Sequence, residues 1–219
     1  MTNKKMTTER ALNIAFALSM ITIVYNVIEG LISVFFGMED KTLALLGFGV
    51  DSFVEVISGM GIAHMIWRMK FGKAEFTDKF ERQALRITGF AFYLLTAGLV
   101  AGAVINIIQN NQPHTTMVGI IISSISILTM FFLMRYKLKF GKILGSDAII
   151  ADANCTRSCF YLSILLLVSS GLYEIFQIGY IDTIGSLGIA YFAFNEGREA
   201  FEKVRTGKFS CCGDGSCET

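Results

Sequence analysis

The amino-acid sequence predicts an all-α membrane protein with six transmembrane helices, arranged as an inverted repeat of three plus three, with both termini in the cytoplasm. Three observations lead to this fold class: long apolar segments fill most of the chain, basic residues gather on one side of them, and one short polar pattern occurs twice. The 219 residues are 53% hydrophobic and only 17% charged, with a single proline. That composition is too apolar for a soluble domain of this length.

Six segments are long and apolar enough to cross a bilayer, which requires about 20 helical residues. They are residues 11–36, 42–67, 87–109, 116–134, 146–178 and 183–204. The first is longer and more polar than the core of a signal peptide, so we expect it to be a retained helix. The chain then divides into a polar cytoplasmic lead (1–9), a transmembrane domain (10–205) and a flexible, cysteine-rich cytoplasmic tail (206–219).

The distribution of lysine and arginine predicts the orientation of the segments. Seventeen of the 19 lie at the two chain ends or in the connections after the second and fourth segments, whereas Lys41 lies on the opposite side and Arg157 inside a segment. Positive residues concentrate in cytoplasmic loops, so both termini are predicted to be cytoplasmic. We expect the charged connection from Lys70 to Arg86 to be a solvated loop. The net charge of +1 indicates no nucleic-acid partner.

A twelve-residue pattern occurs in both halves of the chain. The two copies are Ala44–Glu55 (ALLGFGVDSFVE) and Ala148–Cys159 (AIIADANCTRSC). Each has a candidate metal ligand at the eighth place and another four residues later. These ligands are Asp51 and Glu55 in the first copy and Cys155 and Cys159 in the second. Residues four apart share one face of a helix. The two segments run in opposite directions, as in inverted repeats that bind their substrate near the midplane.

Two carboxylates and two thiols facing each other would form a four-ligand cation site. Acidic residues one turn apart in a bilayer repel each other unless a cation or protons intervene. A single cysteine in a membrane helix is usually a small packing residue, and this interpretation stays open for Cys155 and Cys159, although their matched spacing favours ligands. The set suits Zn²⁺ first, with Cd²⁺, Fe²⁺ and Co²⁺ as alternatives, because Mg²⁺ and Ca²⁺ prefer oxygen ligands alone.

Other polar side chains are candidates for supporting this site. They are Asn26 and Glu29 in the first segment and Asp152 and Arg157 in the fifth. Glu29 could face a polar interior or reach the outer interface, and both alternatives stay open. Arg157 is expected on another helix face, with Asp152, Asp147 or Glu29 as its partner.

The tail has three further thiols, those of Cys211, Cys212 and Cys217. They could collect soft metal ions from the cytoplasm, or the tail could be inert. In a reducing compartment structural disulfides are not expected. In the third segment Gly98 and Gly102 form a GxxxG pattern, which indicates a tight helix contact within the subunit or across a dimer.

Three passages are similar to those of a known family. They are TLALLGFGVDSFVEVISG, GSDAIIADANCTRSCFYLS and YIDTIGSLGIAYFAFNEG. On these passages the chain resembles the transmembrane domain of the cation diffusion facilitator family, antiporters of divalent metal cations and protons, over approximately residues 8–205. The resemblance implies a transport site of Asp51, Glu55, Cys155 and Cys159. Glu55 replaces the usual Asp, and both fifth-segment ligands are Cys. The family's usual C-terminal cytoplasmic domain is not seen, so we expect a homodimer formed through membrane helices.

We therefore expect a transporter that exports a divalent transition-metal ion in exchange for protons by alternating access, and not an enzyme. The metal is its cargo, so no permanent cofactor is expected. One alternative is a membrane protein that binds or senses metal without transporting it. A less favoured one is a membrane thiol oxidoreductase using Cys155 and Cys159, since cysteines on adjacent helical turns are poorly placed for a disulfide. A bacterial inner membrane is the default location.

Overall fold

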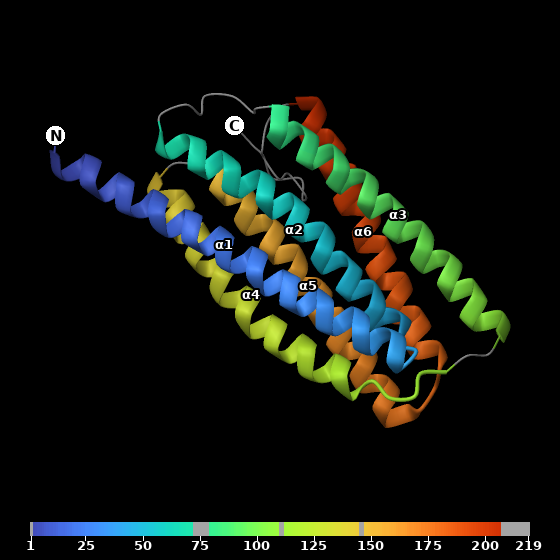
Figure 1. Ribbon diagram of the computed structural model, residues 1–219. Coiled ribbons are helices and arrows are strands. Elements are labelled where there is room, and N and C mark those ends of the chain that lie inside the picture. The colour runs from blue at the N-terminus through green and yellow to red at the C-terminus, as the bar shows by residue number, and fades with distance from the viewer. Residues whose placement is uncertain (1, 72–78, 110–111, 145–146, 207–219) are drawn as a thin grey trace, which may run out of the picture.

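The computed structural model describes residues 2–71, 79–109, 112–144 and 147–206. These residues form a bundle of six long helices (Figure 1). The helices are α1 (Thr2–Glu39), α2 (Leu43–Lys70), α3 (Lys79–Gln109), α4 (Met117–Leu144), α5 (Asp147–Phe176) and α6 (Tyr180–Thr206). The shortest has 27 residues, which at about 1.5 Å per residue is long enough to cross a bilayer. The predicted class, an all-α membrane protein of six helices, is confirmed.

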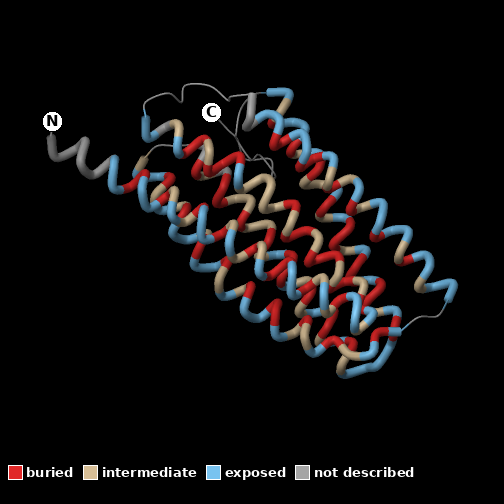
Figure 2. The backbone as a smooth tube through the Cα atoms, in the orientation of Figure 1, coloured by how far each residue is buried: buried red, intermediate tan, exposed pale blue. Residues whose placement is uncertain are grey.

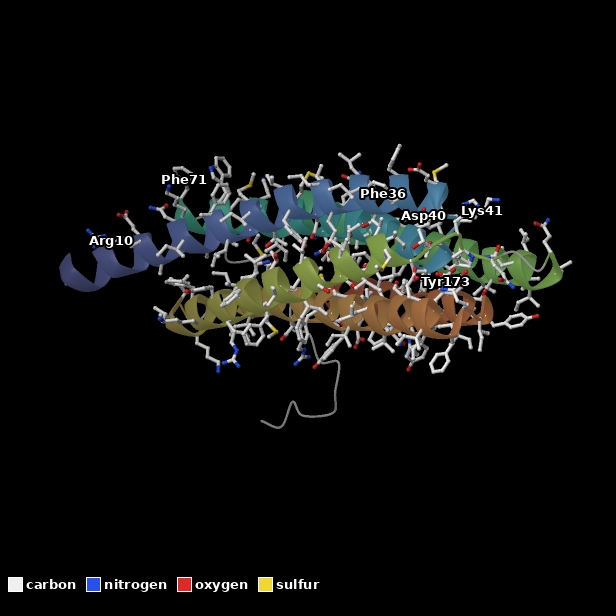
Figure 3. All side chains as sticks on the ribbon, turned by 90° about the horizontal axis from the view of Figure 1, so that it is seen from below. Arg10, Phe36, Asp40, Lys41, Phe71 and Tyr173 are labelled. Carbon is white, nitrogen blue, oxygen red and sulfur yellow. The ribbon has the colours of Figure 1, made fainter. Side chains whose placement is uncertain are left out.

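Successive helices run in opposite directions along the bundle. Arg10 and Phe71 lie at one end, which we call the inner end, and Asp40, Lys41 and Tyr173 lie at the other, the outer end (Figure 3). Helix α1 packs along α2, α4 packs along α5, and α3 packs along α6. If α1, α2 and α3 are exchanged with α4, α5 and α6, the α1–α2 pair becomes the α4–α5 pair. The α3–α6 pair stays the same. This packing is what an inverted repeat requires.

The bundle carries its apolar side chains outside and many polar ones inside. Helix α1 exposes Ile21, Val24, Ile28, Leu31 and Phe35, and buries Ser19, Asn26 and Glu29 on its other side. Each helix has buried positions along one side and exposed positions along the other (Figure 2). A lipid environment imposes such a distribution, because polar groups must find their partners within the protein.

Helix α6 is the most polar of the described helices. The other five are long and apolar enough to cross a membrane by length and composition. The inner half of α6 includes Glu196, Arg198 and Glu199. The expected span of residues 183–204 therefore has the necessary length, but its charged half has to face the interior of the bundle or the inner surface.

Two of the predicted connections are partly helical. Helix α3 begins at Lys79 and α4 continues to Leu144, so the solvated loop expected to extend to Arg86 ends earlier, and the fourth helix continues well past residue 134. The physical reason is that an apolar run marks where a helix leaves the lipid, whereas the backbone hydrogen bonds continue through charged residues beyond it.

Close packing seals the outer half of the bundle. Its apolar core comes from α2, α3, α5 and α6, and includes Leu45, Phe48, Leu99, Leu166 and Ile189. At Gly49 the backbones of α1 and α2 approach so closely that a Cβ atom would lie 2.7 Å from the Val34 nitrogen.

A cap from α6 completes the closure of the outer end. Asp182 accepts hydrogen bonds from the backbone nitrogens of Leu43 at 2.8 Å and Ala44 at 3.3 Å. A carboxylate at this position caps the first turn of α2 and complements the positive end of its dipole. Helices from the two halves are thus joined at the outer end.

Candidate metal centre

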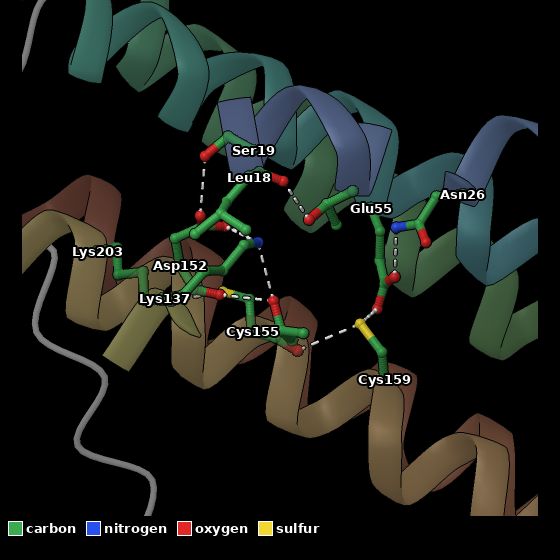
Figure 4. Close-up of polar contacts among 11 residues, drawn as sticks. Leu18, Ser19, Asn26, Glu55, Lys137, Asp152, Cys155, Cys159 and Lys203 are labelled. Atoms are coloured by element: carbon green, nitrogen blue, oxygen red, sulfur yellow. Dashed lines mark hydrogen bonds and ion pairs between the residues drawn. The ribbon is translucent and has the colours of Figure 1, made fainter. Parts of the chain in front are cut away.

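Glu55 of α2 and Cys159 of α5 meet inside the bundle, near the middle of helices that run in opposite directions. The Cys159 thiol donates a hydrogen bond to Oε1 of Glu55. The Asn26 amide of α1 donates one from Nδ2 to Oε2 of the same carboxylate at 2.9 Å (Figure 4). The structure thus brings together one predicted ligand from each copy of the repeated pattern, 104 residues apart.

The other two predicted ligands lie one helical turn to either side of this pair. Asp51 is one turn toward the outer end and 2% exposed, and its Oδ1 accepts no hydrogen bond from the described part of the chain. Cys155 is one turn toward the inner end, with Sγ 3.8 Å from Nζ of Lys203. Within the described residues, no three His, Cys, Asp or Glu side chains are close enough together to hold a metal ion in this arrangement.

A pocket leads from the Glu55–Cys159 pair toward the inner end. It encloses ≈ 440 Å³, including the part open to solvent. Asn26, Glu55 and Cys159 line its deep end, and Thr22, Ser58 and Cys155 lie one turn further inward. Three of the four predicted ligands, Glu55, Cys155 and Cys159, therefore line a pocket on the inner side of mid-bundle, while Asp51 lies outside it and the outer half is packed.

The structure places Glu29 in the polar interior and not at the outer interface. Its side chain is 5% exposed. Oε1 accepts a hydrogen bond from the Tyr25 hydroxyl at 2.9 Å, and Oε2 accepts one from the Ser52 hydroxyl at 3.1 Å. Glu29, Asp51 and Glu55 form what we call the acidic cluster. The side chains that donate hydrogen bonds to it within the described residues are uncharged.

Asp152, one of the three partners suggested for Arg157, forms an ion pair with Lys137. Nζ of Lys137 lies 3.0 Å from Oδ1 of Asp152, and the two side chains are 1% and 8% exposed. Lys137 also donates to the Thr156 hydroxyl at 3.0 Å, and Ser19 donates to Oδ2 of Asp152 at 3.0 Å. We call Ser19, Lys137, Asp152 and Thr156 the ion-pair cluster. It ties α1, α4 and α5 together.

Two buried or pocket-lining positions were missed by the reasoning from sequence. Lys137 was counted with the basic residues in the connection after the fourth segment, yet it follows the buried residues Met130 and Leu133 at helical spacing. That periodicity was the available signal. Glu196 of the sixth segment was not singled out, but it lines the pocket.

Some predicted residues lie outside the described part of the chain. The tail cysteines Cys211, Cys212 and Cys217 belong to residues 207–219, and the side chain of Asp147, a suggested partner of Arg157, is also outside it. Their proposed roles stay predictions.

Comparison with known proteins places the chain among membrane transporters. Residues 15–205 match the family model described as the cation efflux transmembrane domain. The uncharacterized transporter MJ0449 of Methanocaldococcus jannaschii is 29% identical over 181 residues, which cover 78% of this chain and 62% of the relative. The chain thus spans less than two thirds of the length of that curated relative.

Proposed function

This chain belongs to the cation efflux family, and from that premise we propose that it exports a divalent transition-metal ion in exchange for protons. Zn²⁺ is the first candidate, with Cd²⁺, Fe²⁺ and Co²⁺ as alternatives. The transport site consists of Asp51, Glu55, Cys155 and Cys159. The observation that carries this proposal is the contact of Glu55 with Cys159 across two oppositely directed helices.

The chemistry of the four side chains supports a borderline or soft ion. Thiolates favour such ions, and two thiolates with two carboxylates can provide the tetrahedral shell that Zn²⁺ takes in proteins. The orphaned Oδ1 of Asp51 fits the same role, because a buried carboxylate oxygen without a donor is stabilised by a cation. To close the shell, Cys155 has to leave Lys203 and turn toward Glu55.

The packing of the two ends supports alternating access. The pocket extends from Glu55 and Cys159 toward the inner side of the bundle, and the outer half is packed by the apolar core and the Asp182 cap. An ion from the cytoplasm binds in this arrangement. A rocking motion of the halves then opens the outer end, where protons compete for the carboxylates and thiolates and release the ion.

The same proposal covers the assembly and location of the protein. We infer a homodimer in the inner membrane of a bacterium, joined through membrane helices, with both termini cytoplasmic. A Cβ atom added at Gly98 of α3 would meet no atom within 4 Å, whereas one at Gly102 would lie 3.0 Å from Leu43. Gly102 thus serves a contact within the subunit, which leaves Gly98 on a surface where another helix could approach.

The test is metal flux in proteoliposomes. When a pH gradient is imposed, reconstituted protein should move Zn²⁺ in the direction opposite to proton flow. Asp51→Asn and Glu55→Gln should each reduce the initial rate to background. Ser124→Ala is the matched control, because this hydroxyl is exposed and bonds only to the Ile120 carbonyl of its own helix. Wild-type flux in Glu55→Gln would contradict the proposed site. Metal binding without flux in the unmodified protein would instead favour the non-transporting alternative.

A further inference from the structure

Within the described part of the chain, the buried side-chain amide of Asn26 forms a hydrogen bond through its nitrogen but not through its oxygen. The side chain is 1% exposed and lines the pocket beside Glu55. Nδ2 donates to Glu55, whereas Oδ1 accepts no hydrogen bond from the residues that the structure describes. Among the described pocket-lining side chains, it is the one with a buried oxygen left without a partner.

The orientation of this amide follows from its neighbour. A carboxylate can only accept hydrogen bonds, so the amide nitrogen has to face Glu55 and the carbonyl oxygen has to face away from it (Figure 4). A buried carbonyl without a donor has lost its hydrogen bonds to water and gained none in return, which is unfavourable. A leucine of similar size has no carbonyl to bury and would avoid that cost. We therefore expect Oδ1 of Asn26 to bind a partner in at least one state of the protein.

The inverted repeat gives an independent reason to place Asn26 at the cation site. The residue 104 positions later is Met130, which packs with Cys159 in one buried cluster. In each half, a side chain of the first helix of that half lies beside the second predicted ligand. Asn26 of α1 lies beside Glu55, and Met130 of α4 lies beside Cys159. Met130 lies in an apolar cluster, whereas Asn26 lines the pocket and has a buried oxygen without a hydrogen-bond donor among the described residues.

We propose that the carbonyl oxygen of Asn26 is a fifth ligand of the transported cation and that it sets the selectivity of the site. This inference rests on the proposed function. Zn²⁺ is almost always satisfied by four ligands in closed protein sites. An extra neutral oxygen therefore adds little for Zn²⁺, and it favours ions that accept a larger and more oxygen-rich shell, such as Co²⁺ and Fe²⁺.

The competing explanation is that Asn26 only positions Glu55 through its amide hydrogen. Two substitutions separate these roles. Asn26→Leu removes both ends of the amide at similar volume. Asn26→Asp keeps an oxygen ligand but loses the donor and sets a second carboxylate beside Glu55. A ligand role therefore predicts that Asp substitutes well, and a positioning role predicts that it does not.

The experiment measures binding of Co²⁺ and Zn²⁺ to the full chain in detergent by equilibrium dialysis, together with the visible absorption of bound Co²⁺. Tetrahedral Co²⁺ absorbs strongly and five-coordinate Co²⁺ more weakly. Asn26→Leu should strengthen the absorption and weaken Co²⁺ binding by roughly 10- to 100-fold, the usual effect of losing a group at a metal site, with a much smaller loss for Zn²⁺. Asn26→Asp should bind both ions at least as tightly as the wild type.

Ser124→Ala is the control. Ser124 is exposed on α4, away from the pocket-lining residues, and its hydroxyl bonds to the Ile120 carbonyl of its own helix at 2.7 Å. This variant should keep the wild-type spectrum and the wild-type ratio of Co²⁺ to Zn²⁺ affinity.

The outcomes separate this inference from the proposed function. An unchanged spectrum in Asn26→Leu, or Asn26→Asp binding as weakly as Asn26→Leu, overturns the ligand role of Asn26. An unchanged Co²⁺ spectrum in Glu55→Gln overturns both the site and the inference. Binding and spectra as expected, combined with no flux in proteoliposomes, overturn transport and leave the fifth ligand supported.

Discussion

Asp152 and the acidic cluster are two solutions to the same physical problem, a carboxylate inside a membrane protein. Asp152 has a lysine ammonium at 3.0 Å and a serine hydroxyl on its other oxygen. Glu29 receives hydrogen bonds from tyrosine and serine, and Glu55 from asparagine and cysteine, whereas Oδ1 of Asp51 is buried without a partner. Among the described residues, Asp152 has a built-in cation and the three carboxylates of the acidic cluster do not.

Under the proposed function, this difference separates a structural carboxylate from those that bind the transported cation. A buried charge is stable only if it is paired, and Lys137 provides this pairing for Asp152. A permanent lysine at the acidic cluster would compete with the metal ion. Leaving that cluster without a cation lowers the stability of the empty protein, which is a common cost at functional sites.

The largest effect is expected from removing the built-in cation. Lys137→Met leaves the Asp152 charge buried and unpaired, which costs about 3–5 kcal/mol, and it should lower the midpoint of thermal unfolding in detergent followed by circular dichroism. Adding Asp152→Leu should recover most of the loss. Asp51→Asn, by contrast, should not destabilise the protein, because it removes a charge that has no partner. A Lys137→Met variant as stable as the wild type would remove the distinction between the two clusters.

A smaller effect is expected from pH, at the proposed metal site and not at the ion-pair cluster. Carboxylates and thiols have to lose their protons before they bind metal, so Zn²⁺ affinity should fall as the pH falls. Each proton displaced on binding contributes about tenfold per pH unit. Equilibrium dialysis of Zn²⁺ at a series of pH values gives the slope. The Lys137→Met, Asp152→Leu double variant should keep this slope, and an affinity independent of pH would exclude proton competition.

The smallest effect is expected from the neutral donors of Glu29. Tyr25→Phe and Ser52→Ala each remove one hydrogen bond to this carboxylate, worth about 1–3 kcal/mol for a charged acceptor. Initial flux rates in proteoliposomes should fall several-fold in each variant, without the complete loss expected for Asp51→Asn. Rates equal to those of the wild type in both variants would place Glu29 outside the transport pathway.

Sequence reasoning succeeded where a signal is local to one helix. The apolar runs predicted all six helices because a bilayer demands about 20 such residues in succession. The spacing of four put Asp51 with Glu55 and Cys155 with Cys159 on common faces, because this spacing is a property of a single helix. Both inferences need only the periodicity and composition of one segment.

Sequence reasoning failed where the partner comes from another helix. Lys137 looks like an inner-surface charge because it follows the apolar run of the fourth helix and is surrounded by other basic residues. Its burial depends on α1 and α5 covering that part of α4, where Ser19 and Thr156 complete the cluster. Asp152 was one of three partners suggested for Arg157, but its ion pair with Lys137 was decided by the packing of α4 against α5.

The chain by itself determined the membrane class, the six helices and the pairs of candidate ligands, since each follows from residue type and spacing within one segment. Tertiary packing alone decided that Glu55 meets Cys159, that a pocket lies beside this pair, and that Lys137 neutralises Asp152. The physical reason is that hydropathy and helical periodicity act over a few residues. Charge pairing and access depend instead on which faces of distant helices come to lie within a few ångströms of each other.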